Sequence, residues 1–344
     1  MGDIAKGVLG GAWTLLVGWI LPTALNLSVF FFAVAPSLHS AGPVARLWPT
    51  TQAGATLLLL ATSVLLGLVL SALQNQLYRI LEGYLLWPGA AYDYGCARRR
   101  QDKWDLRDRL KLMRLERRAE QHDGVLPVIA TADLALLRAN PRITRAARKD
   151  RRRSGVQRAL LSESLARYPI DDGQIAPTRL GNAIRRFEEY GYDRFRLDTQ
   201  VLWNELTGTA PEQVRRQADL ARTNADFFIA LLAGHAVVAA AAAAALGSAR
   251  ADTPLLLVTA IVLGCLIPLW YRSTVVAVDE WAAAVRALVN VGRKPLAESL
   301  GLALPSDLEA ERTMWALVTK LSRLPYNERR SALDPYRSGG GPGS

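Results

Sequence analysis

The 344-residue sequence contains few of the residues that hold metals or form disulfides, with only two cysteines and three histidines. Cys96 lies in a basic stretch and Cys265 in an apolar one, so we expect no disulfide between them. No group of cysteines and histidines has the spacing of metal ligands. The pair Asp171–Asp172 before Gly173 lacks the further acids of a calcium loop and is interpreted as a turn. We therefore expect no metal and no cofactor.

The common catalytic and nucleotide-binding signatures are also missing. The chain contains no GxxxxGK[ST] loop, no HExxH pair and no GxSxG elbow. No local sequence around His39, His122 or His235 suggests a catalytic triad. We therefore expect that the protein is not an enzyme.

Charged residues are rare in four long stretches of the chain. At about 1.5 Å of rise per residue, a helix of each stretch crosses the ~30 Å apolar core of a bilayer. Strand patterns are also lacking. The sequence therefore predicts an all-α integral membrane protein with four transmembrane helices in two hairpins, at residues 13–35, 54–73, 226–247 and 255–278.

The remaining segments are polar and show helical spacing. Residues 90–225 are expected to form an α-helical cytosolic region, 279–324 to form C-terminal cytosolic helices, and 325–344 to be a disordered tail ending in a GGGPGS linker from cloning.

Several helix ends are predicted from local signals. Thr178 is a helix N-cap, Gly191 and Gly292 are helix stops, and Ser306 with Glu309 forms a capping box. A helix that begins after Pro211 is expected to continue into the third span.

The distribution of basic residues predicts the orientation. The net charge is +11, and residues 74–225 hold 29 Lys/Arg against 20 Asp/Glu. In the two short loops between paired spans, the only Lys or Arg residues are Arg46 and Arg250. By the positive-inside rule, both termini and the central region lie in the cytoplasm. Richness in alanine and arginine suggests a bacterial source, so we expect a multi-pass protein of the bacterial inner (plasma) membrane.

Two arginine-rich clusters are predicted to contact anionic lipid headgroups. Nucleic acid is the alternative, but no aromatic residues suited to base stacking interrupt these runs, so no nucleic-acid partner is expected. The clusters are Arg98, Arg99 and Arg100, and then Arg142, Arg145, Arg148, Arg151, Arg152 and Arg153.

Polar residues inside the spans are candidates for lining a pore: Asn26, Thr56, Thr62, Ser63 and His235. An ionisable group within a membrane helix is costly and suggests function. The competing interpretation is that Asn26 and His235 form hydrogen bonds between helices, and Gly234 allows the close approach that such packing needs.

Two sequence stretches, LYRILEGY at 77–84 and YPIDDGQIAPTRLGNAIRRFEEY at 168–190, resemble a family of bacterial multi-pass membrane proteins. This resemblance implies no activity. The layout of two spans, a cytosolic helical insert, two spans and a cytosolic tail is similar to that of bestrophin-type anion channels, which are homopentamers. It is a likeness of layout, so no site residue is carried over.

These observations lead to two hypotheses of function. The first is an oligomeric membrane channel or pore that is lined by the second span and conducts anions concentrated by the basic cytosolic region. The second is a membrane-anchored regulatory protein that binds lipid or a cytosolic protein partner through its helices. Because four helices enclose little space by themselves, we expect a homo-oligomer.

Overall fold

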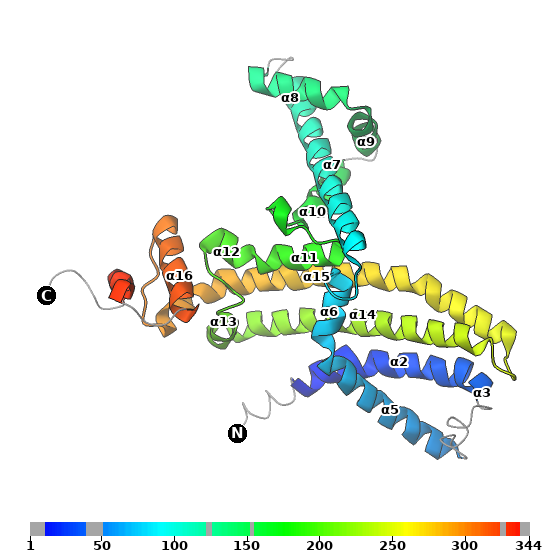
Figure 1. Ribbon diagram of the computed structural model, residues 1–344. Helices are drawn as coiled ribbons and strands as arrows, with labels where there is room; N and C mark the ends of the chain where they lie inside the picture. Colours follow the sequence, from blue (N-terminus) through cyan, green and yellow to red (C-terminus); the bar gives the residue numbers. More distant parts are fainter. Residues whose placement is uncertain (1–10, 39–50, 122–125, 152–154, 324–327, 338–344) are drawn as a thin grey trace. The chain divides into compact units, whose positions relative to one another are not determined.

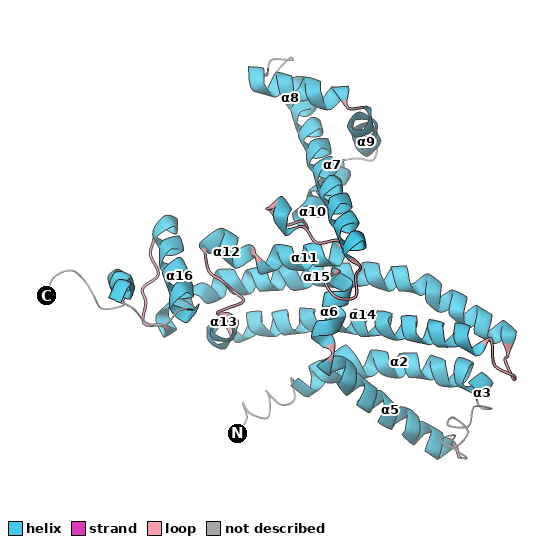
Figure 2. Ribbon diagram, viewed as in Figure 1, coloured by secondary structure: helices cyan, strands magenta, loops and turns pink. Residues whose placement is uncertain are grey.

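The computed structural model describes residues 11–38, 51–121, 126–151, 155–323 and 328–337. Within these ranges the chain is all-α, and the only extended pairing is an isolated bridge between Leu302 and Arg337 (Figures 1 and 2). The chain forms two compact units. Unit 1 comprises residues 1–80 and 190–344, and unit 2 comprises residues 81–189. The stretch 90–225, expected to be one cytosolic region, is thus divided between the two units.

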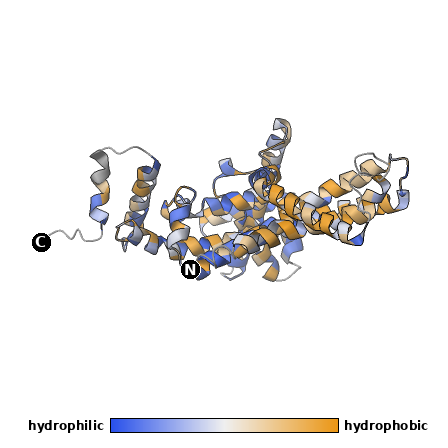
Figure 3. Cartoon of the chain, turned by 90° about the horizontal axis from the view of Figure 1, so that it is seen from below, coloured by the Kyte–Doolittle hydropathy of each residue, from blue (hydrophilic) through white to orange (hydrophobic). Residues whose placement is uncertain are grey.

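Four helices are long and apolar enough to cross a membrane, as the sequence predicts (Figure 3). All four belong to unit 1 and cover the expected spans except for residue 73 and residues 246–247, which lie just past the ends of their helices. This composition is consistent with a multi-pass membrane protein. The helices cover Gly11–Leu38, Gln52–Ala72, Glu212–Ala245 and Thr253–Ser299.

The first span is an irregular helix with two π-helical turns. It contains η1 (Leu16–Ile20), α2 (Leu21–Val29), η2 (Phe30–Val34) and α3 (Ala35–Leu38). Pro22 stands in the first turn of α2, directly after η1, where its missing N–H interrupts the regular hydrogen-bond ladder.

The second span, α5 (Gln52–Ala72), packs on the first span through Gly67. A Cβ atom at Gly67 would lie 2.9 Å from Cα of Ile20, so only glycine allows this approach. The next helix, α6 (Gln74–Glu82), follows after a single non-helical residue, Leu73. The chain therefore continues as a helix beyond the second span, with one interruption.

The third and fourth spans form the longest pair of helices in unit 1. As expected, α14 (Glu212–Ala245) begins directly after Pro211 and runs unbroken into the apolar stretch. The fourth span, α15 (Thr253–Ser299), continues past the predicted stop at Gly292. That prediction was wrong because Gly292 is a packing glycine, where an added Cβ would lie 2.9 Å from Cδ1 of Leu206. The positive φ typical of a helix stop occurs instead at Gly301 (φ 71°).

Two short helices precede α14 in unit 1: α12 (Tyr190–Phe195) and α13 (Trp203–Thr209). Gly191, predicted as a helix stop, lies inside α12. It is buried there, and a Cβ would meet the carbonyl oxygen of Leu197 at 2.8 Å. Close packing thus explains this glycine, as it does the one in α15.

The C-terminal helix α16 (Leu308–Arg323) is held to α15 by buried side chains. Nε of Arg293 lies 2.8 Å from Oε1 of Glu311, an ion pair without hydrogen-bond alignment. Trp315, which is fully buried, donates from Nε1 to the same oxygen at 3.2 Å. The helix is capped by Asp307, which accepts from the amide of Ala310. The predicted cap at Ser306 is therefore wrong by one residue.

The tail does not begin at residue 325 as expected, since η4 (Glu328–Tyr336) is a 3-10 helix. The amide of Ala303 donates to the carbonyl of Tyr336 at 2.7 Å, which fixes this segment beside the end of α15. The GGGPGS linker begins at residue 339 and lies outside the described residues.

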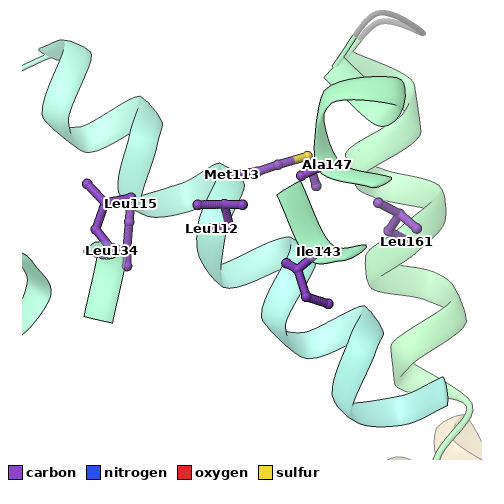
Figure 4. Close-up of a cluster of buried hydrophobic side chains, with 7 residues drawn as sticks. All are labelled: Leu112, Met113, Leu115, Leu134, Ile143, Ala147 and Leu161. Carbon is purple, nitrogen blue, oxygen red and sulfur yellow. The ribbon is translucent and has the colours of Figure 1, made fainter. Parts of the chain in front are cut away.

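Unit 2 has a hydrophobic core of its own, built around one long helix. The seven buried side chains shown in Figure 4 come from four helices and include Leu112, Leu134, Ile143 and Leu161. The helices of this unit are α7 (Gly89–Gln121), α8 (Val128–Ala139), α9 (Pro141–Arg151), α10 (Gly155–Ala166), η3 (Asp172–Gln174) and α11 (Arg179–Glu188).

Candidate functional site

Asn26 and His235, both candidates from the sequence, form a buried polar pair between the first and third spans. Oδ1 of Asn26 lies 2.7 Å from Nδ1 of His235. The amide nitrogen of Asn26 donates to the carbonyl of Pro22 at 2.8 Å, and this bond fixes which amide atom faces the imidazole. Because a carbonyl oxygen can only accept, Nδ1 of His235 carries the proton. The two groups therefore satisfy each other inside the apolar bundle.

The neighbours of this pair close the space around it. An added Cβ at Gly234 would collide with the Asn26 amide, so glycine at this position permits the contact. The imidazole meets the ring of Trp270 from α15 edge-on, with centroids 6.0 Å apart. His235 and Asn26 are 7% and 5% exposed, which places both away from any open surface of a single copy.

A second polar contact joins α6 to the beginning of the apolar part of α14. The hydroxyl of Tyr78 donates to Oδ1 of Asp226 at 2.9 Å, and both residues are buried. The ring of Tyr78 also meets that of Trp281 edge-on at 6.2 Å. Asp226 lies nine residues before His235, about 13 Å along the helix. Neither Tyr78 nor Asp226 was predicted as a site residue from the sequence. The position of Asp226 at the start of an apolar run was the one available signal.

A third contact lies at the other end of the spans, where the amide of Asp252 donates to the hydroxyl of Ser37 at 3.2 Å. Asp252 also caps α15 by accepting from the amide of Leu255. These three contacts each join polar groups of different helices, and such pairs stabilise helix packing in a membrane.

The three candidates on α5 do not share one environment. Thr56 is exposed, Thr62 is partly buried and Ser63 is 1% exposed against the first span. Each hydroxyl donates to the carbonyl four residues earlier in the same helix, at 3.1, 2.6 and 2.6 Å. Their donors are therefore satisfied without water, and the hydroxyl oxygens of Thr56 and Thr62 keep lone pairs available because these two residues are at least partly exposed.

The first basic cluster is only partly available to a ligand. Arg98 is exposed, whereas Arg99 forms an ion pair with Asp102 at 2.9 Å. Arg100 donates to the carbonyl of Asp172 at 3.5 Å. Two members of this cluster therefore contribute to the structure of unit 2.

The second basic cluster lies on α9. Arg142 forms an ion pair with Asp105 at 2.7 Å, while Arg145 and Arg148 are exposed and have no ion-pair partner among the described residues. Arg151 ends α9, and Arg152 and Arg153 lie outside the described residues.

The two stretches that carried the family resemblance meet in unit 2. Thr178 caps α11 as predicted, accepting from the amide of Gly181 at 2.9 Å, and donates to the carbonyl of Glu82 at 3.1 Å. Gly83 has φ 98° and lies against Pro177, where a Cβ would collide with the proline ring. These residues are explained by packing and capping.

The expected turn at Asp171–Asp172 is confirmed by η3, in which Asp171 accepts from the amide of Gly173. Asp172 receives hydrogen bonds from Nζ of Lys103 at 2.6 Å and from Nε1 of Trp104 at 2.8 Å. These bonds, that from Lys103 first, hold the pKa of the Asp172 carboxyl below its ordinary value. Among the described residues, no group of three His, Cys, Asp or Glu side chains is arranged to hold a metal.

The structure therefore defines an all-α chain with four candidate membrane-spanning helices and paired polar groups between them, consistent with a multi-pass membrane protein. Comparison with protein-family models, with curated proteins and with solved structures finds no match. The two resemblances drawn from the sequence thus gain no support, and the chain is assigned to no family.

Proposed function

We propose that the chain assembles into a homo-oligomeric membrane channel in which α5 faces the shared axis. The observation that carries the proposal is the position of α5. This helix packs against the first span, through Ser63 and Gly67, and leaves its other sides uncovered. Because its main contacts among the described residues are with the first span, α5 is a natural element for contacts around a common axis.

The interior of a single copy does not favour conduction. Asn26 bonds to His235, and Tyr78 bonds to Asp226. Groups that satisfy each other in this way do not replace the hydration shell of an ion. The passage is therefore proposed between copies, with Thr56 and Thr62 as candidate lining residues and Asn26 and His235 as packing residues.

The basic residues support an anion as the conducted ion. Residues 81–189 hold 23 Lys/Arg against 15 Asp/Glu. We infer a bacterial plasma membrane with both termini in the cytoplasm, because the short loops between paired spans hold only Arg46 and Arg250. In that orientation the positive field of unit 2 raises the anion concentration at the cytoplasmic entrance.

The test is ionic current through purified protein in planar bilayers, with thiol reagents applied to a single cysteine in α5. Thr62→Cys is the test variant. Val64→Cys is its control at nearly the same depth, because two residues of helix turn the side chain about 200°. Both variants carry Cys265→Ser, since Cys265 is exposed. We expect a charged reagent to block current through the Thr62→Cys protein and to leave the Val64→Cys protein unaffected.

Two results would count against the channel. One is a strict monomer by mass photometry in detergent and in nanodiscs. The other is an absence of current across a range of voltage, membrane tension and anion composition.

A second candidate is a membrane-anchored regulatory protein that binds a cytosolic partner. The specific observation in its favour is that unit 2 has its own hydrophobic core, separate from the spans. A purified protein that carries no current, yet binds one soluble partner with a saturable isotherm through unit 2, would favour this function over the channel.

A further inference from the structure

The outer face of α8 in unit 2 is unusual because it is apolar and exposed. Val128, Ile129 and Leu136 are 86%, 80% and 72% exposed, and Ala132 and Ala135 between them are exposed as well. These positions follow helical spacing and form one continuous stripe.

The opposite face of α8 is already used to fold unit 2. Leu134 is buried in the core with Leu112 and Leu115 of α7, and Leu137 packs against the same cluster. Asp133 forms an ion pair with Lys111 at 2.8 Å. The helix is therefore apolar on both faces, and the core explains only one of them.

The neighbouring helix supplies positive charge. α9 packs on both α7 and α8 and directs Ile143 and Ala147 into the core. Its exposed side chains Arg145, Arg148 and Lys149 have no ion-pair partner among the described residues. Such a combination suits an anionic membrane surface. An apolar stripe can enter the acyl-chain region, and basic groups on the neighbouring helix can bind the lipid phosphates.

We propose that α8 and α9 form a docking surface for an anionic lipid bilayer. Val128, Ile129 and Leu136 enter the boundary between acyl chains and headgroups, while Arg145 and Arg148 bind lipid phosphate. The four candidate spans keep the chain at a bilayer, so this surface meets lipid at a high effective concentration. The proposal concerns unit 2 and does not depend on whether the spans conduct ions.

The experiment measures the depth of a nitroxide at Ala132→Cys in the full-length protein, carrying Cys265→Ser and reconstituted into nanodiscs. Ala132 is exposed and small, so the label disturbs little. Accessibility to oxygen and to a water-soluble nickel complex is compared in phosphatidylcholine discs and in discs with phosphatidylglycerol. We expect a label immersed in the apolar layer of the anionic discs.

Variants that remove basic side chains test whether Arg145 and Arg148 bind the docking surface to the anionic bilayer. Each basic residue near an anionic surface favours binding about fivefold, so Arg145→Gln with Arg148→Gln should shift the docked fraction about 30-fold toward water. The matched control removes two exposed arginines of unit 2 that lie outside both predicted lipid-binding clusters, Arg158→Gln with Arg179→Gln, and should leave the label immersed. Leu136→Glu should also release α8, and unchanged circular dichroism verifies folding in each variant.

Three results would overturn the proposal. The label could be aqueous in anionic discs, or its immersion could be insensitive to both lipid charge and the α9 variants. A short distance between labels on different copies, measured by pulsed dipolar spectroscopy, would instead make this surface an interface between chains.

Discussion

Breaking the polar pair between Asn26 and His235 tests whether it packs the first span on the third. Replacing either residue by leucine leaves the other polar group buried without this partner. Such a bond is worth about 0.6–2 kcal/mol in a membrane, and an orphaned buried group costs about 1–3 kcal/mol. We expect each single variant to lose about 1–2 kcal/mol of stability. The double variant should lose about 1 kcal/mol less than the sum, because the second substitution removes a group already without its partner.

Gly234 gives an independent perturbation of the same contact. In Gly234→Ala the new methyl group would collide with the Asn26 amide, and overpacking of this kind costs about 1–3 kcal/mol. The matched control is Gly264→Ala in the fourth span, where a Cβ meets nothing within 4 Å. Because alanine favours helix over glycine, this control should be neutral or slightly stabilising.

The assay is reversible unfolding in mixed dodecyl maltoside and dodecyl sulfate micelles, followed by circular dichroism. A coupling energy within about 0.3 kcal/mol of zero would refute the pairing of Asn26 with His235. Equal stabilities for Gly234→Ala and Gly264→Ala would refute the close approach of the two helices. If the pair lines a pore instead, variants of unchanged stability should alter conductance.

Three further predictions concern regions outside this pair. The hydrogen bond from Lys103 holds the pKa of the Asp172 carboxyl below its ordinary value. The ionised carboxylate therefore stabilises the folded protein fully at a pH above the ordinary pKa, and this stabilisation is lost as the pH falls through the lowered pKa of the folded state. Asp172→Asn should remove this decrease in folding stability at low pH, which is measured by following unfolding through tryptophan fluorescence at a series of pH values. Burial raises the pKa of the Cys96 thiol, so maleimide, followed by mass spectrometry, should modify it only after unfolding. Glu311→Leu breaks the ion pair between the buried Glu311 and the partly exposed Arg293, at a cost of about 2–3 kcal/mol, somewhat less than for a fully buried pair, and limited proteolysis should then release α16.

The elements defined by local chemistry could be predicted from the sequence. The four spans follow from long, mainly apolar runs, and the cap at Thr178 follows from a hydroxyl residue placed before a helical pattern. The predictions that helices end at Gly191 and Gly292 were wrong for a physical reason. A glycine can supply either a positive φ or a close approach, and Gly292 supplies the second while Gly301 supplies the first.

The polar pairs depend on contacts that no local pattern encodes. Asn26 and His235 could each be selected as a costly polar residue within a span. Their contact could not be predicted, because the two residues are 209 positions apart in the sequence. Tyr78 and Asp226 were not selected, because a tyrosine near the end of a helix and an acid before an apolar run are ordinary in isolation. Their significance arises only when the helices are brought together.

The fourth span also has a mechanical property that follows from its two internal prolines. α15 contains 47 residues and is about 70 Å long, and a proline in the interior of a helix removes one hydrogen bond. Pro268 leaves the carbonyl of Gly264 without its usual donor, so bending concentrates at that turn. The stretch of about 40 Å between Pro268 and Pro295 then acts as a stiff lever. A tilt of about 5° at Pro268 displaces the far end of that lever by about 3 Å, where Arg293 holds α16.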